Sequence, residues 1–423
     1  LTFFFLRVFR YSIMQRKGLE KAVERERFEF FVYFILEQGE IAMRLIHLSD
    51  LHLGKRVNEF SMLEDQRYIL GQILEIIDRE KPDGVLLVGD IYDKTAPGEE
   101  AVRLLDGFLM KLAERKLQVY IISGNHDSAV KLSFAAGLID RSGIHFAPVY
   151  DGTVQPCILR SGKEQICIYM LPFIKPATVR AAFPDEKIAD YTEAVRAAIA
   201  HMEIDPEAYN VLMAHQFVTG ARRSDSEEVS VGGLDQVDAS VFAPFDYVAL
   251  GHIHGPQQAG RETIRYCGTP LKYSFSEASQ TKSVTAVDIT LDKEKKETVI
   301  RTIPLTPKRD LRQLRGSYAE ITDRRVYEGT ALDDYVQITL TDEEDVPDAM
   351  AKLRLIYPNL MLLRYDNART REQRVMTGTA EVERRTPLEL FEEFYEMQNN
   401  QPMSAEQHTL VQELIAGIWE QGG

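Results

Sequence analysis

The sequence predicts an α/β protein with a parallel sheet, followed by a smaller α/β unit and a C-terminal helical segment. The first observation is the run of residues 85–90, in which four apolar residues lead through Gly89 to Asp90. Such a run is typical of a strand that is buried on both faces. The second observation is that stretches with helical spacing separate this run from similar ones, which indicates parallel strand–helix–strand units.

Four more strand-like runs also end in residues that can bind a metal. In open α/β sheets, ligands bind beyond the carboxyl ends of the strands, so the five runs are expected to deliver these side chains to one edge. The runs, each with the residues that follow it, are 44–49 with Asp50 and His52, 85–89 with Asp90, 118–124 with Asn125, His126 and Asp127, 210–214 with His215, and 246–251 with His252 and His254. The sequence therefore predicts a metal site at this edge.

The elements of the first domain, residues 43–304, follow in order. Residues 64–78 and 99–114 repeat apolar residues at helical spacing and are predicted to be helices. The remaining segments are two hairpin-like runs at 155–159 and 165–171, a helix at 191–202, a long polar loop at 219–236, and strands at 262–267 and 283–291.

Residues 305–370 are predicted to form a small second domain with a β-α-β pattern at 335–341, 346–357 and 359–364. Pro347 suits the first turn of its helix. Residues 371–385 are charged and poor in large apolar residues, which favours a linker. Residues 386–423 contain two short amphipathic helices, preceded by capping boxes that start at Thr386 and Ser404.

Residues 1–42 differ in character from the chain that follows them. Their apolar stretches are interrupted by Arg7 and Arg10 or are too short to span a bilayer, which excludes a signal peptide and a membrane span. Met43 stands directly before the first strand, and the codons of Gly39 and Glu40 would be purine-rich, like a ribosome-binding site. We expect residues 1–42 to be a translated leader that is not part of the native protein; a short amphipathic appendage is the alternative.

Length and composition describe a globular protein with two or three domains, since the 423 residues are 44% hydrophobic and 27% charged. The net charge of −15 argues against a broad basic face for nucleic acid, although a local groove could still be positive. If the protein acts on DNA, a partner is expected to supply much of the phosphate contact. Cys157 and Cys167 could face each other across a hairpin, but free thiols in a reducing cytoplasm are the favoured interpretation for all three cysteines.

The predicted ligand types suit hard divalent ions such as Mn²⁺, which accept carboxylate, amide oxygen and imidazole ligands. Two such ions about 3.5–4 Å apart can clamp a phosphoryl group, and the central Asp90 suits a bridge between them. Asp50 and His52, like His252 and His254, are two residues apart, so both members of each pair can point to one side of an extended chain. A further histidine that binds no ion could protonate the leaving oxygen.

The ordered series D-x-H, G-D, G-N-H-D, H and G-H-x-H between Asp50 and His254 resembles the calcineurin-like metallophosphoesterases. The stretches 49–54, 247–254, 266–270 and 273–275 resemble, within that superfamily, the SbcD family, the nuclease subunits of bacterial SbcCD complexes. The resemblance covers residues 43–423 and is strongest up to about residue 290. It implies a four-layer αββα core, a capping domain, and a C-terminal helix pair that binds an SbcC-like coiled-coil ATPase.

The resemblance also implies roles for single residues. One metal would be bound by Asp50, His52, Asp90 and His254, and the other by Asp90, Asn125, His215 and His252. His126 matches the proton donor of the family, and Asp127 is expected to orient its neighbours. Where archaeal relatives carry a histidine near the phosphate, this chain has Asp93, which we expect to lie on the surface or in a supporting position. Arg222 and Arg223 are candidates for phosphate contact; the alternative is a solvated loop balanced by Glu227 and Glu228.

The favoured function is a manganese-dependent DNA nuclease, exonucleolytic on duplex ends and endonucleolytic on single strands or hairpins. It would act in the cytoplasm as a homodimer with an SbcC-like ATPase, stimulated by ATP, in DNA repair, recombination and replication. A phosphomonoesterase or cyclic-nucleotide phosphodiesterase on the same core is the alternative, but neither needs a second domain and paired C-terminal helices. The intact ligand set argues against a third hypothesis, a DNA-end scaffold without catalysis.

Overall fold

The structure is a computed structural model that describes residues 43–133, 140–147, 149–227, 235–292, 295–368, 388, 391–392, 395 and 403–421. The leader expected at residues 1–42 and the linker expected at 371–385 lie outside these residues. None of the helices formed by the described residues is long and apolar enough to span a membrane.

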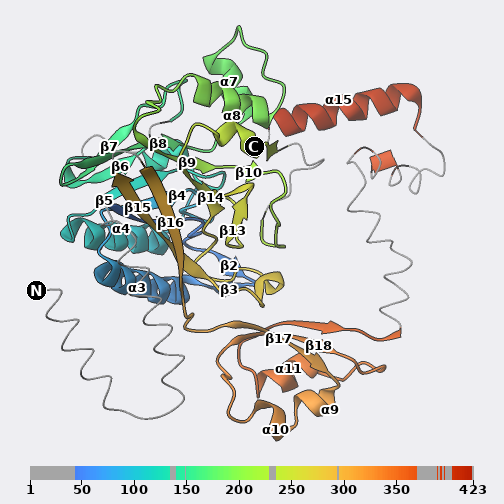
Figure 1. The fold of residues 1–423 in the computed structure, drawn as a ribbon. Coiled ribbons are helices and arrows are strands. Elements are labelled where there is room, and N and C mark those ends of the chain that lie inside the picture. The colour runs from blue at the N-terminus through green and yellow to red at the C-terminus, as the bar shows by residue number, and fades with distance from the viewer. Residues whose placement is uncertain are drawn as a thin grey trace, which may run out of the picture.

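Two six-stranded sheets form the centre of the larger domain (Figure 1). The first sheet, in the order β16-β15-β1-β4-β5-β6, consists of β1 (Met43–Leu48), β4 (Gly84–Val88), β5 (Gln118–Ile122), β6 (Ile144–Phe146), β15 (Ser283–Asp292) and β16 (Lys295–Pro304). The second, in the order β13-β14-β12-β9-β8-β7, consists of β7 (Cys157–Ser161), β8 (Glu164–Leu171), β9 (Tyr209–His215), β12 (Tyr247–Gly251), β13 (Gln257–Ala259) and β14 (Arg261–Tyr266). The inner strands of both sheets pair in parallel, which confirms the predicted parallel units.

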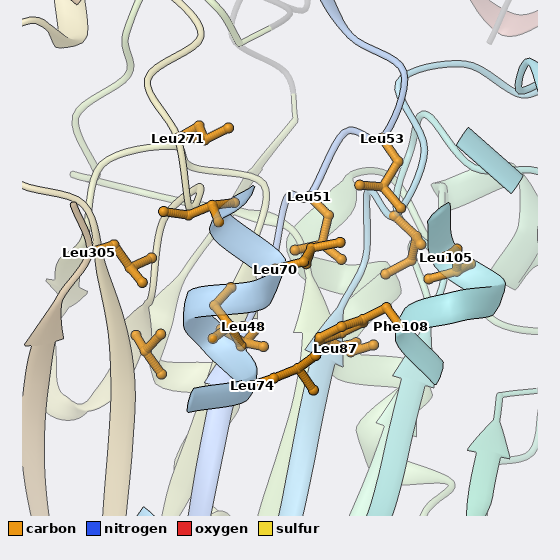
Figure 2. Packing of buried hydrophobic residues seen from close by; sticks show 14 of the residues in the cluster. Leu48, Leu51, Leu53, Leu70, Leu74, Leu87, Leu105, Phe108, Leu271 and Leu305 are labelled. Carbon is orange, nitrogen blue, oxygen red and sulfur yellow. The ribbon is translucent and has the colours of Figure 1, made fainter. Parts of the chain in front are cut away.

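Helices cover the outer faces of the two sheets. They are α3 (Leu63–Glu80) and α4 (Glu99–Glu114) on the first sheet, and α7 (Pro176–Ala182) and α8 (Tyr191–Ala200) on the second. Leu70 and Leu74 of α3 and Phe108 of α4 pack with Leu48 and Leu87 of the strands (Figure 2). Burying each such side chain contributes about 1.5–3 kcal/mol, so this cluster holds the strand ends firmly. A third apolar cluster fills the space between the sheets, and the expected four-layer αββα arrangement is thereby confirmed.

The second domain has its own parallel sheet and its own core. The sheet consists of β17 (Leu311–Gly316), β18 (Tyr335–Leu340) and β19 (Leu360–Tyr365), covered by α9 (Tyr318–Ile321), α10 (Arg324–Tyr327) and α11 (Ala349–Arg354). The predicted β-α-β pattern is β18, α11 and β19. The helix begins at Ala349 and not at Pro347, because Asp348 before it has a left-handed backbone.

The second domain contacts the first at the N-terminal turn of α3. The buried Asp65 accepts hydrogen bonds from Arg309 Nε and Nη2, at 3.0 and 2.7 Å, and from Tyr335 Oη at 2.8 Å. The next residue, Gln66, donates from Nε2 to the backbone carbonyl of His52 at 2.7 Å. One helical turn therefore contacts both the second domain and a loop of the predicted metal site.

The shorter elements connect these layers. They are β2 (Arg56–Val57), β3 (Phe60–Ser61), β10 (Phe217–Val218), β11 (Gln236–Val237), α5 (Ala129–Leu132), and the 3-10 helices η1 (Asp140–Ser142), η2 (Ala239–Phe242) and η3 (Phe275–Glu277). β7 and β8 form the predicted hairpin, in which Cys157 lies opposite Ile168 and Cys167 opposite Ile158. The two thiols therefore do not face each other, and all three cysteines are free, as favoured.

The C-terminal helix α15 (Ala405–Gln421) begins as the sequence predicts (red in Figure 1). Gln407 N donates to Ser404 Oγ, and Ser404 N donates to Gln407 Oε1, at 3.2 and 2.9 Å, which is the reciprocal pattern of a capping box. Of the helix predicted after Thr386, the structure describes four residues, all helical: Leu388, Phe391, Glu392 and Tyr395.

Candidate metal centre

Five strands from both sheets end at one site, as predicted. β1, β4 and β5 of the first sheet lead to Asp50, His52, Asp90 and Asn125, and β9 and β12 of the second lead to His215, His252 and His254. Of these seven side chains, all but Asn125 are buried. The parallel strands thus direct their carboxyl ends to the same edge in both sheets.

Four of these residues have a left-handed backbone, which is unusual for residues other than glycine. Their φ angles are 53° for Asp50, 43° for His52, 47° for Asp90 and 103° for His252. Each such residue costs on the order of 1–3 kcal/mol and persists only where the surroundings enforce it. Here Asp50 N donates to the Gly89 carbonyl and His52 N to the Asp90 carbonyl, at 3.0 and 2.9 Å, so the loops after β1 and β4 hold each other.

Two glycines are required by close approach to these side chains. A Cβ on Gly89 would lie 2.3 Å from Nδ1 of His215, and one on Gly124 would lie 2.1 Å from Oδ1 of Asp90. Gly89 also has a φ of +74°, which any other residue would adopt at a cost. The G-D and G-N motifs therefore admit only glycine for reasons of space.

The first ligand group contains Asp50, His52 and His254, whose ligand atoms lie within 4.8 Å of one another. The Nε2 atoms of His52 and His254 are 3.1 Å apart. Asp90 Oδ2 lies 3.7 Å from His52 Nε2.

The second ligand group contains Asp90, Asn125, His215 and His252. Oδ1 of Asn125 lies 3.1 Å from Nε2 of His215 and 2.9 Å from Nδ1 of His252. Oδ2 of Asp90 lies 3.3 Å from Nε2 of His215. Asp90 thus faces both groups, as a bridging carboxylate would.

Burial and the neighbouring carboxylates set the protonation states of the histidines in these groups. Burial lowers the pKa of His252 to about 3 and that of His52 well below its usual value, so both rings are neutral and able to bind a metal. Burial also acts to lower the pKa of His215, but the Asp90 charge and hydrogen bond and the Asp50 charge outweigh it and raise this pKa to about 9. His215 is therefore protonated in the metal-free site and would release that proton on binding an ion.

His126 lies at the rim of the first group. Its backbone N donates to Asp90 Oδ1 at 2.9 Å, and its ring Nδ1 donates to the Asp93 carbonyl at 3.1 Å. Nε2 then faces the site and lies 4.0 Å from Asp90 Oδ2. This position suits a proton donor as well as it suits a ligand, since His52, Asp90 and His126 also form a close group.

Asp127 and Asp93 hold other parts of the site. Asp127 accepts hydrogen bonds from the backbone N of Gly124, Ile91 and Tyr92 at 2.9, 3.0 and 2.9 Å, so it ties the loops after β4 and β5 together. Asp93 Oδ1 lies 2.8 Å from Lys55 Nζ, which gives Asp93 a supporting position beside the site.

The polar loop predicted at residues 219–236 is not simply solvated, because part of it is buried against the site. Glu227, expected to balance charge in solvent, is buried and accepts a hydrogen bond from the backbone N of His254 at 2.7 Å. Arg223 is held by Asp235 at 2.6 Å, and its guanidinium lies 3.6 Å from the centre of the Phe217 ring, whereas Arg222 is exposed. Glu228 lies outside the described residues.

The sequence interpretation missed the residues that surround His254. They are Ser226, Glu227, Glu277 and Lys282. Ser226 lies 51 residues from Glu277, and no local pattern marks such a contact. The available signal was the SbcD-like stretch 273–275, which lies directly before Glu277.

Comparison with known proteins places this site in a family. The calcineurin-like phosphoesterase family matches residues 43–256, and the type 5 capsule protein repressor C-terminal domain (SbcD_C) matches residues 307–399. The SbcD subunit of the SbcCD nuclease from Staphylococcus epidermidis is 31% identical over 388 residues, which cover 90% of this chain and 100% of that protein. Among solved structures, a dimetal phosphatase from Danio rerio has 12% identity and a TM-score of 0.38, with 62% of this chain and 96% of that chain covered. The protein TT1561 of Thermus thermophilus has 14% identity and a TM-score of 0.34, with 61% and 98% covered.

Proposed function

Because the chain belongs to the calcineurin-like phosphoesterases and, within them, to the SbcD family of nuclease subunits, we propose that it is a two-metal DNA nuclease. The observation that carries the proposal is the pair of ligand groups, with Asp90 in the second group and 3.7 Å from His52 Nε2 of the first. The proposed ions are Mn²⁺, which accepts the mixed oxygen and imidazole ligands of this site. The proposed reactions are exonuclease cleavage of duplex ends and endonuclease cleavage of single strands or hairpins, both stimulated by ATP through a partner.

The described residues divide the chemistry among them. Two bound divalent ions would supply an activated water and neutralise charge on the phosphate. Asp90 lies within reach of both groups, since its Oδ2 is 3.7 Å from His52 Nε2 and 3.3 Å from His215 Nε2. Of the two arginines proposed to contact phosphate, Arg222 is the stronger candidate, because the Arg223 guanidinium is already paired with Asp235.

His126 is proposed to protonate the leaving oxygen. In the charged ring, Nδ1 donates to the Asp93 carbonyl and Nε2 carries the proton to be transferred. Transfer leaves a neutral ring with its proton on Nδ1, which is the tautomer that the Asp93 carbonyl stabilises. The hydrogen bond therefore directs the reactive nitrogen towards the site both before and after transfer.

The C-terminal helices are proposed to bind the coiled coil of an SbcC-like ATPase. Leu410 and Leu414 of α15 lie four residues apart on the helix and are 56% and 54% exposed. An exposed apolar stripe on a helix is typical of a segment that binds in a groove of a partner. The proposal includes a homodimer of this chain and a cytoplasmic location, which the three free cysteines favour.

The test is cleavage of end-labelled linear duplex DNA with Mn²⁺, with and without the SbcC-like ATPase and ATP. We expect cleavage that requires Mn²⁺ and increases with the partner and ATP. Turnover of small phosphomonoesters or cyclic nucleotides, with DNA untouched in either preparation, would instead establish the small-molecule alternative.

A further inference from the structure

A buried ion pair lies next to the first ligand group without taking part in the proposed chemistry. Glu277 is 0% and Lys282 is 4% exposed, and Lys282 Nζ lies 2.5 Å from Glu277 Oε2. Placing two charges in a protein interior has a large desolvation cost, and a packed apolar pair would stabilise the fold as well. The presence of a buried ion pair here is therefore better explained by the residues that it contacts than by any gain in the stability of the fold.

The pair and its neighbours hold His254 at three points. Ser226 Oγ lies 2.6 Å from Nδ1 of the His254 ring. The backbone N of His254 donates to Glu227 Oε1 at 2.7 Å, and its carbonyl accepts from Lys282 Nζ at 2.8 Å. Ring, amide and carbonyl are thus all fixed by side chains from other segments.

The positions of the protons in this network determine the tautomer of His254. Lys282 donates to Glu277 Oε2, to the His254 carbonyl and to Gln280 Oε1, so its three protons are all used. Ser226 Oγ lies 2.5 Å from Glu277 Oε1, and a carboxylate paired with a lysine can only accept there. The single hydroxyl proton of Ser226 therefore goes to Glu277, and Ser226 must accept a proton from Nδ1 of His254.

We propose that Ser226 and Glu277 are positioning residues that keep His254 in the tautomer protonated at Nδ1. The lone pair of Nε2 then faces the first ligand group, where His52 Nε2 lies 3.1 Å away. Metal-binding histidines commonly donate their other ring N–H to an oxygen atom, which fixes the ring and raises its basicity. The inference rests on the proposed two-metal function and names residues outside the ligand set that support one of its two ions.

The loop that carries Ser226 is docked by the same network. Asp225 N donates to Ser276 Oγ of η3 at 3.0 Å, and Ser224 Oγ donates to Glu277 Oε1 at 3.3 Å. Because Ser226 reaches His254 only when the loop is docked on η3, the geometry of the first ligand group depends on this docking. The second group has no such contact with Ser226 or Glu277 among the described hydrogen bonds.

The test is a Mn²⁺ titration by calorimetry of the full chain, with far-UV circular dichroism to monitor folding. Ser226→Ala should bind one ion about 10–100-fold more weakly and leave the other ion unchanged. Ser226→Thr keeps the hydroxyl and should restore the affinity towards wild type. Thr219→Ala, which removes an exposed hydroxyl at the start of the same loop, is the matched control and should bind both ions normally.

Glu277→Gln is the second variant and should weaken the same ion, but it also leaves Lys282 without its charge partner and can unfold the chain. Ser226→Ala therefore decides the outcome. Unchanged affinity for both ions in folded Ser226→Ala, or equal weakening of both, would overturn the inference while the wild-type chain still bound two ions. A wild-type chain that does not bind two ions would instead overturn the proposed function.

Discussion

The two ligand groups of the candidate metal centre are held in place by different parts of the chain. In the second group, His215 lies on β9 and donates from Nδ1 to the carbonyl of Val88 on β4 at 3.0 Å, so the backbone of both sheets fixes it. In the first group, His254 lies beyond β12 and is fixed by side chains of the polar loop and of the segment around η3. Sheet backbone is among the most stable parts of a fold and loops among the least stable, so the first group should be the more easily disturbed.

A change at Asp90 should disturb both ligand groups equally, because Asp90 faces both of them. Asp90→Asn replaces a carboxylate by a neutral amide, which is a poor bridge between two cations. We expect loss of both ions and of DNA cleavage to background, measured by metal analysis and by a cleavage assay. Asp106→Asn removes an exposed carboxylate of α4 and should change neither. Two ions retained at wild-type affinity by Asp90→Asn would contradict the bridging assignment.

His126→Ala separates metal binding from proton donation. Removal of a general acid typically lowers the rate about 10²–10⁴-fold, and we expect a loss of cleavage in this range with both ions still bound. His145→Ala, which removes a histidine bonded to Asp140 and Gln118, is the control and should cleave normally. Loss of an ion in His126→Ala would show that His126 is a ligand, which its closeness to His52 and Asp90 also permits.

Metal binding should stabilise the whole chain and protect its loops unequally. At about 100 times its Kd, a bound ion raises the free energy of unfolding by about 2.7 kcal/mol, measurable as a higher Tm with Mn²⁺ than with a chelator. Hydrogen exchange should slow more in the polar loop at residues 219–227 than in β9, because the loop contacts the first group through side chains. Equal slowing of exchange in the loop and in β9 would argue that the two groups are equally rigid. In the Tm measurement, Asp90→Asn is the control and should show no gain with Mn²⁺.

The sequence predicts the framework well because that framework depends on local patterns. The apolar runs and helical spacing identify β4 and α4, whose observed bounds are Gly84–Val88 and Glu99–Glu114. The five strand ends converge as expected, since parallel strands direct their carboxyl ends to one edge. The strand β17 was missed because the sequence Leu-Arg-Gln-Leu-Arg-Gly places polar residues on a short strand, which only its pairing with β18 identifies.

The supporting contacts could not be predicted because they join distant segments. Glu227 looks like one of several loop charges, yet it is buried against the His254 amide. Ser226 and Glu277, like Asp65 and Arg309, are brought together only by the folded chain. No periodicity marks such pairs, so sequence motifs identify ligands more readily than the residues that position them.

Of the changes considered, substitutions in α15 are expected to have the smallest effect on metal binding by the two ligand groups. Leu410→Asp combined with Leu414→Asp places two charges on the exposed apolar stripe, where no core packing is lost because both side chains are more than half exposed. The double variant should bind two ions, fold normally and retain the basal cleavage of the isolated chain, yet lose binding of an SbcC-like ATPase and the ATP stimulation. Gln412→Asp, at an exposed polar position of the same helix, is the control and should bind the partner. Wild-type affinity of the double variant for the ATPase would remove α15 from the proposed interface, whereas weaker metal binding would show that this helix supports the metal centre after all.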